Sequence, residues 1–370
     1  MIIIVPDSFK GTMTATEVCE IIKREFLKAD PTADVRCMPI ADGGEGTVDA
    51  LLTGGGERVS VTVNDPYFNK TDSFFGVLPD GTAVIEMAAA SGLPLVGENK
   101  NPLLTTTYGT GELIKAALDR GCKKILIGIG GSATNDGGIG CAAALGARFT
   151  DADGNEVSLN GAGLSAIDKI DLTALDPGLE KTEIKVLCDV TSPLYGRDGA
   201  AYVFAPQKGA DENTVKILDD GLRNLAEVTK NTIGTDNSFL EGAGAAGGLG
   251  FCLVSFLGAG LVGGAPTVLQ AMGFDTLAKQ ADLIITGEGC FDEQSLLGKA
   301  PSCVAALSGD TPVVAVAGRC EISLPEISAI RKIYVTDTVG KPFEILKKEC
   351  FEDLRLTAEQ LVKDYAEKKF

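Results

Sequence analysis

The sequence has 370 residues, of which 45% are hydrophobic and 23% are charged, and its formal net charge at pH 7 is −18. This length predicts two domains, and this composition predicts packed cores rather than a disordered chain. The negative charge excludes a nucleic-acid-binding surface of the usual basic kind, so an anionic ligand would have to be bound by local lysines, arginines, helix N-termini or a metal ion.

The absence of histidine narrows the possible chemistry. It excludes Ser-His-Asp and Cys-His catalysis and every zinc site with histidine ligands, so a metal ion would lie among oxygen ligands, as magnesium does. The ten cysteines are scattered singly without a Cys-x-x-Cys motif, which favours reduced, buried thiols and a cytoplasmic location. We expect no signal peptide, and the most apolar stretch, residues 251–262, is too short and too rich in glycine to span a membrane.

Short apolar runs alternate with helical patterns along the chain. In chain order, these patterns predict a strand at 1–5, a helix from about residue 14, a strand at 35–40, antiparallel strands over 57–87, a helix at 109–121, a strand at 124–128, a helix at 139–145, a strand at 184–187, a helix at 211–229, strands in ADLIITGEG, PVVAVAGR and KIYVTD, and a helix at 351–368. The alternation predicts an α/β fold with an antiparallel portion. Two domains between which the chain crosses fit this pattern better than two domains in series.

The loops at the strand ends are the expected place for a ligand, because open α/β sheets bind ligands beyond the carboxyl ends of their strands. In this chain those loops are PDSFKG, ADGGEGT, GIGGSATNDGG, CDVTSP, TGEGCFDEQ and AGR. Most of them combine glycine or proline with polar side chains. We therefore expect the functional residues to lie in these segments.

The loop GIGGSATNDGG at 128–138 places five glycines in eleven positions after a strand. The backbone N–H groups of such a loop, at the start of the following helix, can bind an anion, with Ser132, Thr134, Asn135 and Asp136 as polar partners. The alternative is a glycine-rich turn that Asn135 or Asp136 caps. A P-loop is excluded because no Gly-Lys-Ser/Thr follows. We favour anion binding, because a cap needs one polar residue rather than four.

Two segments, 242–247 and 258–263, match the dinucleotide-binding pattern Gly-x-Gly-x-x-Gly. Such a site needs a strand before the glycines and a helix after them. The first segment follows Ser-Phe-Leu-Glu, a poor strand, and the second lies inside an apolar, glycine-rich run. Close packing or a backbone-amide site for an anion is the preferred interpretation of both.

Acidic and basic side chains lie in the same strand-end loops. Carboxylates there can hold magnesium or accept a hydroxyl proton, although each can instead cap a helix: Asp42, Glu45, Asp189, Glu288 and Asp292. The lysines in glycine-flanked loops are candidates for binding phosphate or carboxylate: Lys10, Lys208 and Lys299. A phosphoryl transferase needs such carboxylates, lysines and glycine-rich loops. The residues alone therefore predict a magnesium-dependent enzyme that acts on anionic small molecules.

In order along the chain, the strings PDSFKG, ADGGEGT, EMAAASGL, TTTYGTGELI, GIGGSATNDGG, PQKGA, GAGAAGGLG and ITGEG resemble those of the type I bacterial glycerate kinases, from residue 2 to about residue 320. The resemblance implies a kinase that uses ATP and Mg²⁺ to phosphorylate D-glycerate to 2-phosphoglycerate, with 3-phosphoglycerate as the alternative product. It also implies two α/β domains around a cleft. One is a Rossmann-like, parallel, three-layer domain built from residues 1–58 and 281–370, and the other is an inserted mixed α/β domain at 59–280 that contains the antiparallel portion.

By this resemblance, the ligands lie between loops of the two domains. The residues implied in catalysis are Asp189 as the base, Asp42 as the second choice for the base, and Lys10. Those implied in binding substrate or phosphate are Ser8, Lys10, Glu45, Gly130, Gly131, Ser132, Asn135, Asp136, Lys208 and Lys299. Those implied in binding Mg²⁺ are Glu288 and Asp292. Two positions depart from the family pattern: Cys290 stands where the family has an arginine, and Ser192 where it has an asparagine.

Two other functions stay open at this point. The dinucleotide-like segments leave an NAD-dependent hydroxy-acid oxidoreductase as the first alternative. A non-catalytic metabolite-binding protein that has kept the cleft is the second. The expected partners are small molecules, glycerate and ATP, with neither nucleic acid nor membrane, and the chain is expected to be a monomer or a homodimer.

Overall fold

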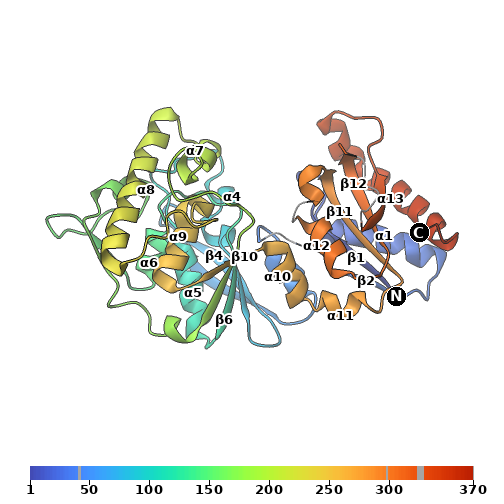
Figure 1. Cartoon of the computed structure of the whole chain (residues 1–370), viewed down its shortest axis with the longest axis horizontal. Coiled ribbons are helices and arrows are strands. Elements are labelled where there is room, and N and C mark those ends of the chain that lie inside the picture. The colour runs from blue at the N-terminus through green and yellow to red at the C-terminus, as the bar shows by residue number, and fades with distance from the viewer. Residues whose placement is uncertain (41–42, 297–298, 323–328, 370) are drawn as a thin grey trace. The chain divides into compact units, whose positions relative to one another are not determined.

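The chain folds into two α/β units, each with its own main sheet and its own core clusters (Figure 1). The computed structural model describes residues 1–40, 43–296, 299–322 and 329–369. Unit 1 contains Met1–Asp42 and Ala265–Phe370, and unit 2 contains Gly43–Gly264. The expected α/β fold, with one unit built from both chain ends and the other inserted between them, is confirmed.

The sheet of unit 1 is parallel throughout, with strand order β13-β12-β11-β1-β2. Its strands are β1 (Ile2–Pro6), β2 (Val35–Cys37), β11 (Leu283–Phe291), β12 (Val313–Cys320) and β13 (Ile330–Val335). The central strands are apolar runs buried on both faces, as parallel strands covered by helices require. Their carboxyl ends lie at one edge of the sheet.

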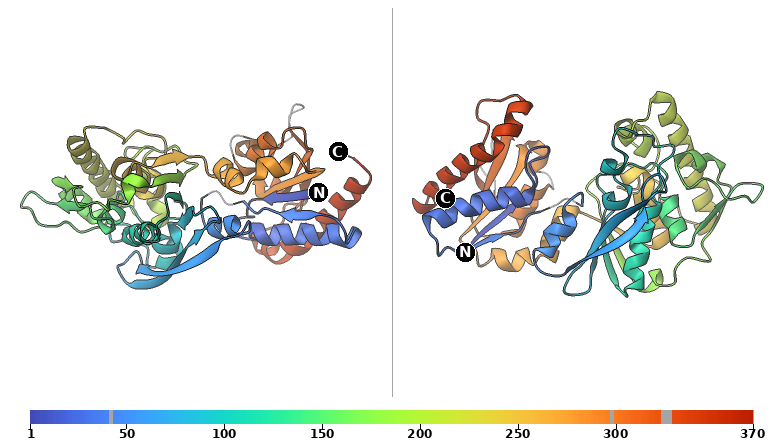
Figure 2. Two further views of the ribbon diagram at one scale, coloured as in Figure 1. Left: turned by 90° about the horizontal axis from the view of Figure 1, so that it is seen from below. Right: turned by 180° about the vertical axis from the view of Figure 1, so that it is seen from behind.

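Helices cover both faces of this sheet. They are α1 (Ala15–Ala29), α10 (Gly264–Ala271), α11 (Phe274–Ala278), α12 (Ala300–Leu307) and α13 (Phe343–Ala366), with a 3-10 turn, η4 (Glu293–Leu296), after β11. α1 and α13 lie side by side on the face that carries Ile2 and Ile4 (Figure 2). α10, α11 and α12 pack on the face that carries Ile3 and Val5. The alternation of side chains along β1 thus divides its apolar residues between two cores.

The first helix begins where the sequence predicts, for a local reason. The Glu17 N–H donates to the Thr14 hydroxyl at 3.2 Å, and the Thr14 N–H donates to the Glu17 carboxylate at 2.8 Å. This capping box satisfies two N–H groups. The last helix begins at Phe343 rather than near residue 351. Its first two turns are mostly exposed and therefore lack the apolar spacing that marks a helix in the sequence.

The sheet of unit 2 has the strand order β10-β9-β6-β5-β4-β3. Its strands are β3 (Glu57–Asn64), β4 (Lys70–Val77), β5 (Ala83–Glu86), β6 (Lys124–Gly128), β9 (Glu183–Leu187) and β10 (Gly260–Val262), and a separate hairpin pairs β7 (Arg148–Thr150) with β8 (Lys169–Asp171). β3, β4 and β5 are antiparallel neighbours, which confirms the prediction for residues 57–87. β5, β6, β9 and β10 are parallel, so their carboxyl ends share one edge.

The helices of unit 2 enclose a core cluster that extends along the chain from Val63 to Ala259. They are α2 (Thr47–Leu52), α3 (Ala88–Ser91), α4 (Leu93–Val96), α5 (Tyr108–Asp119), α6 (Ile139–Ala144), α7 (Ala200–Phe204), α8 (Glu212–Ile233) and α9 (Ala245–Leu257), with 3-10 turns η1 (Gly161–Ala166), η2 (Leu179–Lys181) and η3 (Pro206–Lys208). The long helix α8 is capped by Asp211, whose carboxylate accepts from the Thr214 N–H at 2.7 Å.

The contacts divide the chain at 42/43 and 264/265, whereas the sequence analysis placed the boundaries at 58/59 and 280/281. α2 belongs with unit 2, where the Val48 N–H donates at 2.7 Å to the carboxylate of Glu86 at the end of β5. α10 and α11 belong with unit 1, because Ala265 and Phe274 are part of a core there. In both places a connecting helix joins the sheet that buries it.

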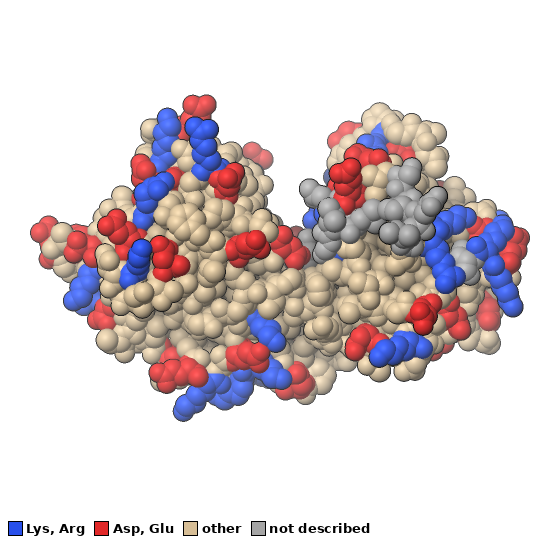
Figure 3. All heavy atoms as spheres, in the orientation of Figure 1, with Lys and Arg blue, Asp and Glu red and all other residues tan. Residues whose placement is uncertain are grey.

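Charged side chains of both signs are intermixed over both units on the face shown in Figure 3, outside the part covered by grey atoms. Among the described residues of this face, no basic stripe of the kind that binds nucleic acid is visible. None of the helices formed by the described residues is both long and apolar enough to cross a membrane.

Candidate active site

In unit 1, the segment after β1 lies against the end of β11 at the carboxyl edge of the sheet. The Asp7 N–H donates to the Gly287 carbonyl at 2.8 Å, which continues the pairing of the two strands. Gly289 permits the close approach of the segment after β1, since a Cβ on Gly289 would lie 3.3 Å from the backbone nitrogen of Lys10. The predicted residues brought together here are Ser8, Lys10 and Glu288.

Glu288 is the buried acid of this group. It is 7% exposed, and its Oε1 has no hydrogen-bond partner. Burial raises the pKa of Glu288 and the charges of Asp7 and Asp292 raise it further, while a hydrogen bond from Ser295 and the charge of Lys299 oppose the shift. A buried acceptor without a donor costs about 1–3 kcal/mol. This oxygen is therefore suited to a cation or a donor that the chain itself does not supply.

Asp292 and Lys299 interact with each other beyond β11. Asp292 Oδ1 accepts from the Ser295 N–H at 3.1 Å and lies 3.4 Å from Lys299 Nζ. Burial raises the pKa of Asp292, but the hydrogen bonds from Ser295 and the charge of Lys299 outweigh burial and lower it. Asp292 thus caps the turn η4. Among the residues that the structure describes, no group of three or more Cys, Asp or Glu side chains is arranged to hold a metal ion.

In unit 2, the segment that begins at Gly43 packs against the carboxyl ends of β6 and β9, with its backbone in direct contact with both strand ends. The Gly130 N–H donates to the Gly43 carbonyl at 3.1 Å, and a Cβ on Gly128 would lie 2.2 Å from the same oxygen. A Cβ on Gly43 would in turn lie 2.8 Å from Leu187 Cβ at the end of β9. Close packing therefore requires these glycines, and it brings the exposed Glu45 to this edge.

In and just after the loop GIGGSATNDGG, backbone N–H groups bind the side chain of the loop's own aspartate, Asp136. The Asp136 carboxylate is fully buried and accepts hydrogen bonds from the Thr107 N–H at 2.7 Å, the Thr107 hydroxyl at 2.8 Å, the Gly138 N–H at 3.1 Å and the Gly140 N–H at 3.3 Å. Burial raises the pKa of Asp136, and these hydrogen bonds oppose the shift. Asp136 caps α6 and fixes the start of α5. It therefore occupies N–H groups that the sequence analysis assigned to a ligand.

Beside Asp136 lies a cluster of buried polar atoms. Thr134 Oγ1 and both polar atoms of the Asn135 side chain are buried without a hydrogen-bond partner. Lys208, which is 2% exposed, donates from Nζ to the Thr134 carbonyl at 2.6 Å. Burial lowers the pKa of Lys208 to about 7, although the charge of Asp136 opposes the shift. Thr134 and Asn135 thus keep hydrogen-bonding capacity that the chain does not use.

The segment GAGAAGGLG packs directly on this loop. Residues 246–248 have left-handed conformations, with φ between 53° and 95°. A Cβ on Gly247 would lie 2.1 Å from the Thr134 carbonyl oxygen, and the Gly137 N–H donates to the Gly247 carbonyl at 3.0 Å. Turns rather than a strand precede these glycines, and the second match, 258–263, contains β10 itself. Neither match has the strand–turn–helix context of a dinucleotide site, in agreement with close packing.

Asp189 lies at the same edge of the sheet of unit 2, directly after β9. The Cys188 N–H donates to the Val262 carbonyl at 2.9 Å and so extends the pairing of β9 with β10. Asp189 follows as an exposed residue, and its Oδ1 accepts from the Gly264 N–H at 2.8 Å. One carboxylate oxygen is thereby held in place at the start of α10.

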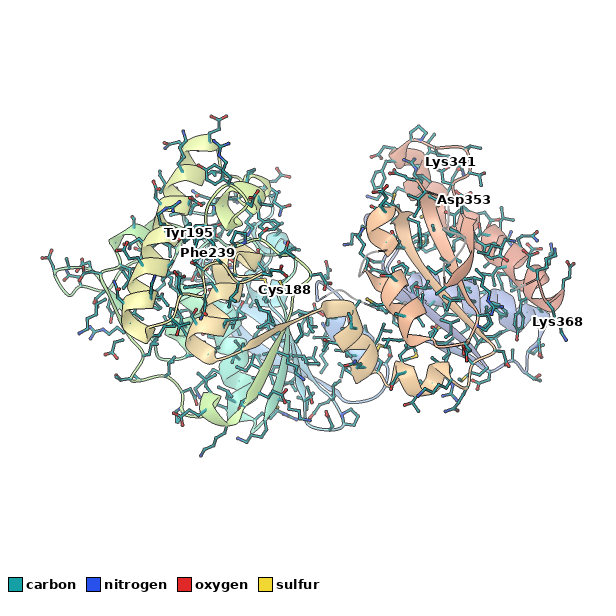
Figure 4. All side chains as sticks on the ribbon, viewed as in Figure 1. Cys188, Tyr195, Phe239, Lys341, Asp353 and Lys368 are labelled. Atoms are coloured by element: carbon teal, nitrogen blue, oxygen red, sulfur yellow. The ribbon has the colours of Figure 1, made fainter. Side chains whose placement is uncertain are left out.

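The chain beyond Asp189 is fixed by backbone and ring contacts. The Gly244 N–H donates to the Ser192 carbonyl at 2.9 Å. Ser192, one of the two positions that depart from the family pattern, is therefore held through its backbone. Figure 4 shows the side chains of Tyr195 and Phe239 together in unit 2; their rings meet edge to face with centroids 5.3 Å apart. The Arg223 guanidinium lies 4.3 Å from the centre of the Tyr195 ring.

The predicted residues therefore fall into two sets at strand-end edges. Unit 1 holds Ser8, Lys10, Glu288, Asp292 and Lys299, and unit 2 holds Glu45, Gly130, Gly131, Ser132, Asn135, Asp136, Asp189 and Lys208. Asp42 lies outside the described residues, and the shared cleft stays a prediction. Sequence reasoning did not single out Asp7 or Thr107, although PDSFKG and TTTYGTGELI, which contain them, carried part of the family resemblance.

Comparison with known proteins shows the same family throughout. The chain matches the glycerate kinase family over residues 2–366. It is 49% identical to the glycerate kinase of Bacillus subtilis (strain 168) over 322 residues, which are 86% of this chain and 84% of that protein. It is 47% identical to the glycerate 2-kinase of Escherichia coli (strain K12) over 323 residues, again 86% of this chain and 84% of that protein.

A solved structure adds the fold to this likeness. The crystal structure of a candidate glycerate kinase 2 from Salmonella typhimurium LT2 is similar with a TM-score of 0.86 at 41% sequence identity, and the similarity covers 100% of this chain and 98% of that chain. These findings confirm the resemblance drawn from the motifs. The chain belongs to the glycerate kinase family and is an enzyme of the kinase class.

Proposed function

We propose that this chain transfers the γ-phosphoryl group of ATP to the 2-hydroxyl group of D-glycerate, with 3-phosphoglycerate as the alternative product. The observation that carries the proposal is the match to the glycerate kinase family over residues 2–366, with a glycerate 2-kinase among the relatives at 47% identity. Phosphoryl transfer depends on positioned carboxylates and cations rather than on covalent catalysis by the protein. It therefore suits a chain without histidine.

Glu288 would hold Mg²⁺ in unit 1 together with Asp7, and Asp292 remains the alternative second ligand. Glu288 Oε1 is a buried oxygen without a hydrogen-bond partner, and like charge from Asp7 raises the pKa of Glu288, an effect that a bound cation would reverse. Mg²⁺ usually takes one or two carboxylates and completes its shell with water and substrate phosphates, so two protein carboxylates fit this ion. When bound, Mg²⁺ neutralises charge on the phosphates. The adjacent Lys10 supplies a second cation for the same purpose.

In unit 2, we assign the anionic substrate to the loop at 128–138 and to Lys208. A negative charge nearby favours the protonated form of an amine, so Lys208, with a pKa of about 7, can take up a proton when the substrate binds. The Asn135 amide offers one acceptor and two donors, which match the hydroxyl groups of glycerate. Because these atoms are closed to solvent, we expect substrate binding to displace a segment that covers them.

Asp189 is our choice for the base that accepts the proton of the glycerate hydroxyl. A general base must be positioned within hydrogen-bond reach of that hydroxyl. The 2.8 Å hydrogen bond from the Gly264 N–H holds one carboxylate oxygen of Asp189, and the side chain is exposed at the end of β9. Asp42 remains the second candidate.

Phosphorus NMR of the protein with MgATP and D-glycerate tests the proposal. We expect the γ-phosphate signal of ATP to decrease as the phosphomonoester signal of 2-phosphoglycerate grows. Asp189→Asn should fold normally and lower kcat on the order of 100-fold, the scale of a lost general base. Asp198→Asn, a change at another exposed aspartate of the same loop, is the matched control and should keep wild-type activity. No turnover by the wild-type protein would refute the proposal.

Binding measurements with NADH, ATP and glycerate separate the alternative functions. Binding of NADH in place of ATP would indicate the oxidoreductase, and binding of glycerate without turnover would indicate the metabolite-binding protein. The family match favours neither. We further propose a cytoplasmic enzyme, because none of the ten cysteines, all of which the structure describes, forms a disulfide, and a reducing compartment keeps cysteines in the thiol state.

A further inference from the structure

The chain contains two pairs of neighbouring cysteines, one pair in each unit, and the two pairs differ in their access to solvent. Cys19 and Cys37 lie in the same core region of unit 1, and Cys141 and Cys252 lie in the core of unit 2. Cys19 and Cys37 influence each other's pKa, and burial together with Cys141 raises the pKa of Cys252. Cys37 is half-buried, whereas the other three residues are fully buried. Neither pair has a role in the reaction proposed above. The first pair, unlike the second, has one thiol within reach of a dissolved reagent.

The backbone brings Cys19 and Cys37 to the same point of the sheet. Cys19 lies on α1, and its Sγ is 3.6 Å from the Ile4 carbonyl oxygen. Cys37 is the last residue of β2 and is the register partner of Ile4 in β1. The Met38 N–H donates to the same carbonyl at 2.8 Å. Cys19 is part of the core under α1, and Cys37 packs against that core, so the two side chains lie near the same Ile4 carbonyl, between the helix and the sheet.

The surroundings of Cys37 favour its thiolate. A hydrogen bond from the Cys19 thiol lowers the pKa of Cys37, with help from the charge of Lys23, while burial and the charge of Glu20 oppose the shift. Burial raises the pKa of Cys19, which stays a thiol. Glu20 and Lys23 also line a surface hollow of about 320 Å³ along α1. A thiolate within reach of solvent, next to a second thiol, is the arrangement of a reactive and a resolving cysteine.

We propose that Cys37 is a site of oxidation by hydroperoxides and that Cys19 converts the product to a disulfide. The Cys37 thiolate attacks one peroxide oxygen, the O–O bond breaks, and the sulfur becomes a sulfenic acid while the peroxide is reduced to an alcohol or water. The Cys19 sulfur then attacks the Cys37 sulfur. The S–S bond forms, the S–O bond breaks, and the hydroxide leaves as water with the proton of the Cys19 thiol.

The pair in unit 2 is the matched internal control. Cys141 and Cys252 are both 0% exposed, and the Cys252 thiol donates to the Gly138 carbonyl at 3.1 Å. Burial raises the pKa of Cys252, and the charge of Asp136 adds to the shift. Each unit thus has two neighbouring cysteines, but both members of the second pair are closed to solvent, whereas Cys37 of the first pair is not. If proximity alone sufficed for oxidation, both pairs would react.

The test uses the reduced full-length protein and hydrogen peroxide, followed by mass spectrometry of the intact chain and of its peptides. We expect the loss of two hydrogen atoms, a cross-link between the peptides that contain Cys19 and Cys37, and recovery of the original mass with dithiothreitol. In Cys19→Ser the sulfenic acid at Cys37 should persist and be trapped by dimedone. In Cys37→Ser the cross-link should be lost, and in Cys252→Ser it should form as in the wild type.

Two results would overturn the proposal. One is a Cys141–Cys252 cross-link that forms in the wild-type chain as fast as the Cys19–Cys37 cross-link. The other is oxidation of other cysteines while Cys37 stays reduced. Both are read from peptides of the wild-type protein, so they hold even if a variant fails to fold.

Discussion

Asp136 and Lys208 are a buried acid and a buried base in the same site, and they differ in the number of hydrogen-bond partners that the chain provides. Asp136 accepts hydrogen bonds from Thr107 and from the N–H groups of two glycines. Lys208 donates to the neutral carbonyl of Thr134, and burial lowers its pKa to about 7. The donors around Asp136 oppose the effect of burial, and the charge of Asp136 does the same for Lys208, but burial prevails in both and shifts each pKa toward the neutral form. Lys208 should therefore affect stability near neutral pH.

The Lys208→Met variant tests this effect. In the unfolded chain the amine titrates near 10.5, and in the folded chain near 7. Between these values the unfolded state holds the proton that the folded state has released, so the free energy of unfolding should rise with pH across this window. Lys208→Met should remove this part of the rise. Urea unfolding at several pH values from 6 to 10 measures the slope.

The exposed Lys216 of α8 supplies the control for this series. Lys216→Met should keep the wild-type slope, because an exposed amine is equally solvated in both states. The structure indicates that the amine of Lys208 is desolvated. If Lys208→Met also keeps the wild-type slope, that conclusion is wrong. A uniform offset at all pH values reports only the lost hydrogen bond to Thr134.

The sequence locates polar positions in the loop at 128–138 but does not show what they contact. Sequence analysis favoured a ligand over a cap for Asp136, whereas the structure assigns the cap. The donors responsible belong to Thr107, 29 residues earlier in the chain, and to glycine N–H groups, which have no signal of their own. The unpaired amide of Asn135 is likewise a property of its surroundings. Residue type and spacing therefore predict where a site lies better than they predict each role.

At the scale of elements, α9 shows how backbone conformation and close packing combine. Its first turn is left-handed at 246–248, which brings the backbone of Gly247 onto the Thr134–Asn135 segment. Gly258, at the other end of the same helix, is also left-handed, with φ of 67°, but nothing lies within 4 Å of a Cβ built there. The two glycines thus share a backbone requirement and differ in packing.

Gly247→Ala and Gly258→Ala separate these two effects. Gly258→Ala should cost about 1–2 kcal/mol, because an L-residue is strained in the left-handed region. Gly247→Ala should cost about 1–3 kcal/mol more, the usual scale of overpacking, because its Cβ would lie 2.1 Å from the Thr134 carbonyl oxygen. Urea unfolding of both variants measures the difference. Equal losses would show that the two segments can move apart without penalty.

Most elements could be predicted from the sequence because apolar periodicity marks them. The prediction succeeds where a strand or helix buries a regular set of side chains, as β1, β6 and α8 do. It omits the short strands β7, β8 and β10 and also the helices α3, α4, α7, α9, α10, α11 and α12. The longest of these, α9, is buried on almost every side, so its apolar residues show no helical period. It also places the boundaries between the units too late in the chain, since the sheet that buries a connecting helix is a tertiary property.

At the scale of the whole molecule, the two units differ in which parts of the chain they need in order to form. The core cluster of unit 2 lies entirely within residues 63–259, so one continuous segment supplies it. In unit 1, β1 pairs with β11, and both cores combine side chains from the two ends of the chain. The N-terminal segment therefore depends on residues that follow the insertion, whereas unit 2 depends on neither end.

Residues 43–264 expressed alone should therefore fold. Their sheet, their core and the hydrogen bonds that hold Asp136, Lys208 and Asp189 are all formed within this range. We expect a single cooperative urea transition and dispersed amide signals in a proton–nitrogen NMR spectrum. Residues 1–42 alone are the control and should stay unfolded, because β1 and α1 there lack β11 and α13. A fragment 43–264 without a cooperative transition would show that unit 2 needs unit 1 for its stability.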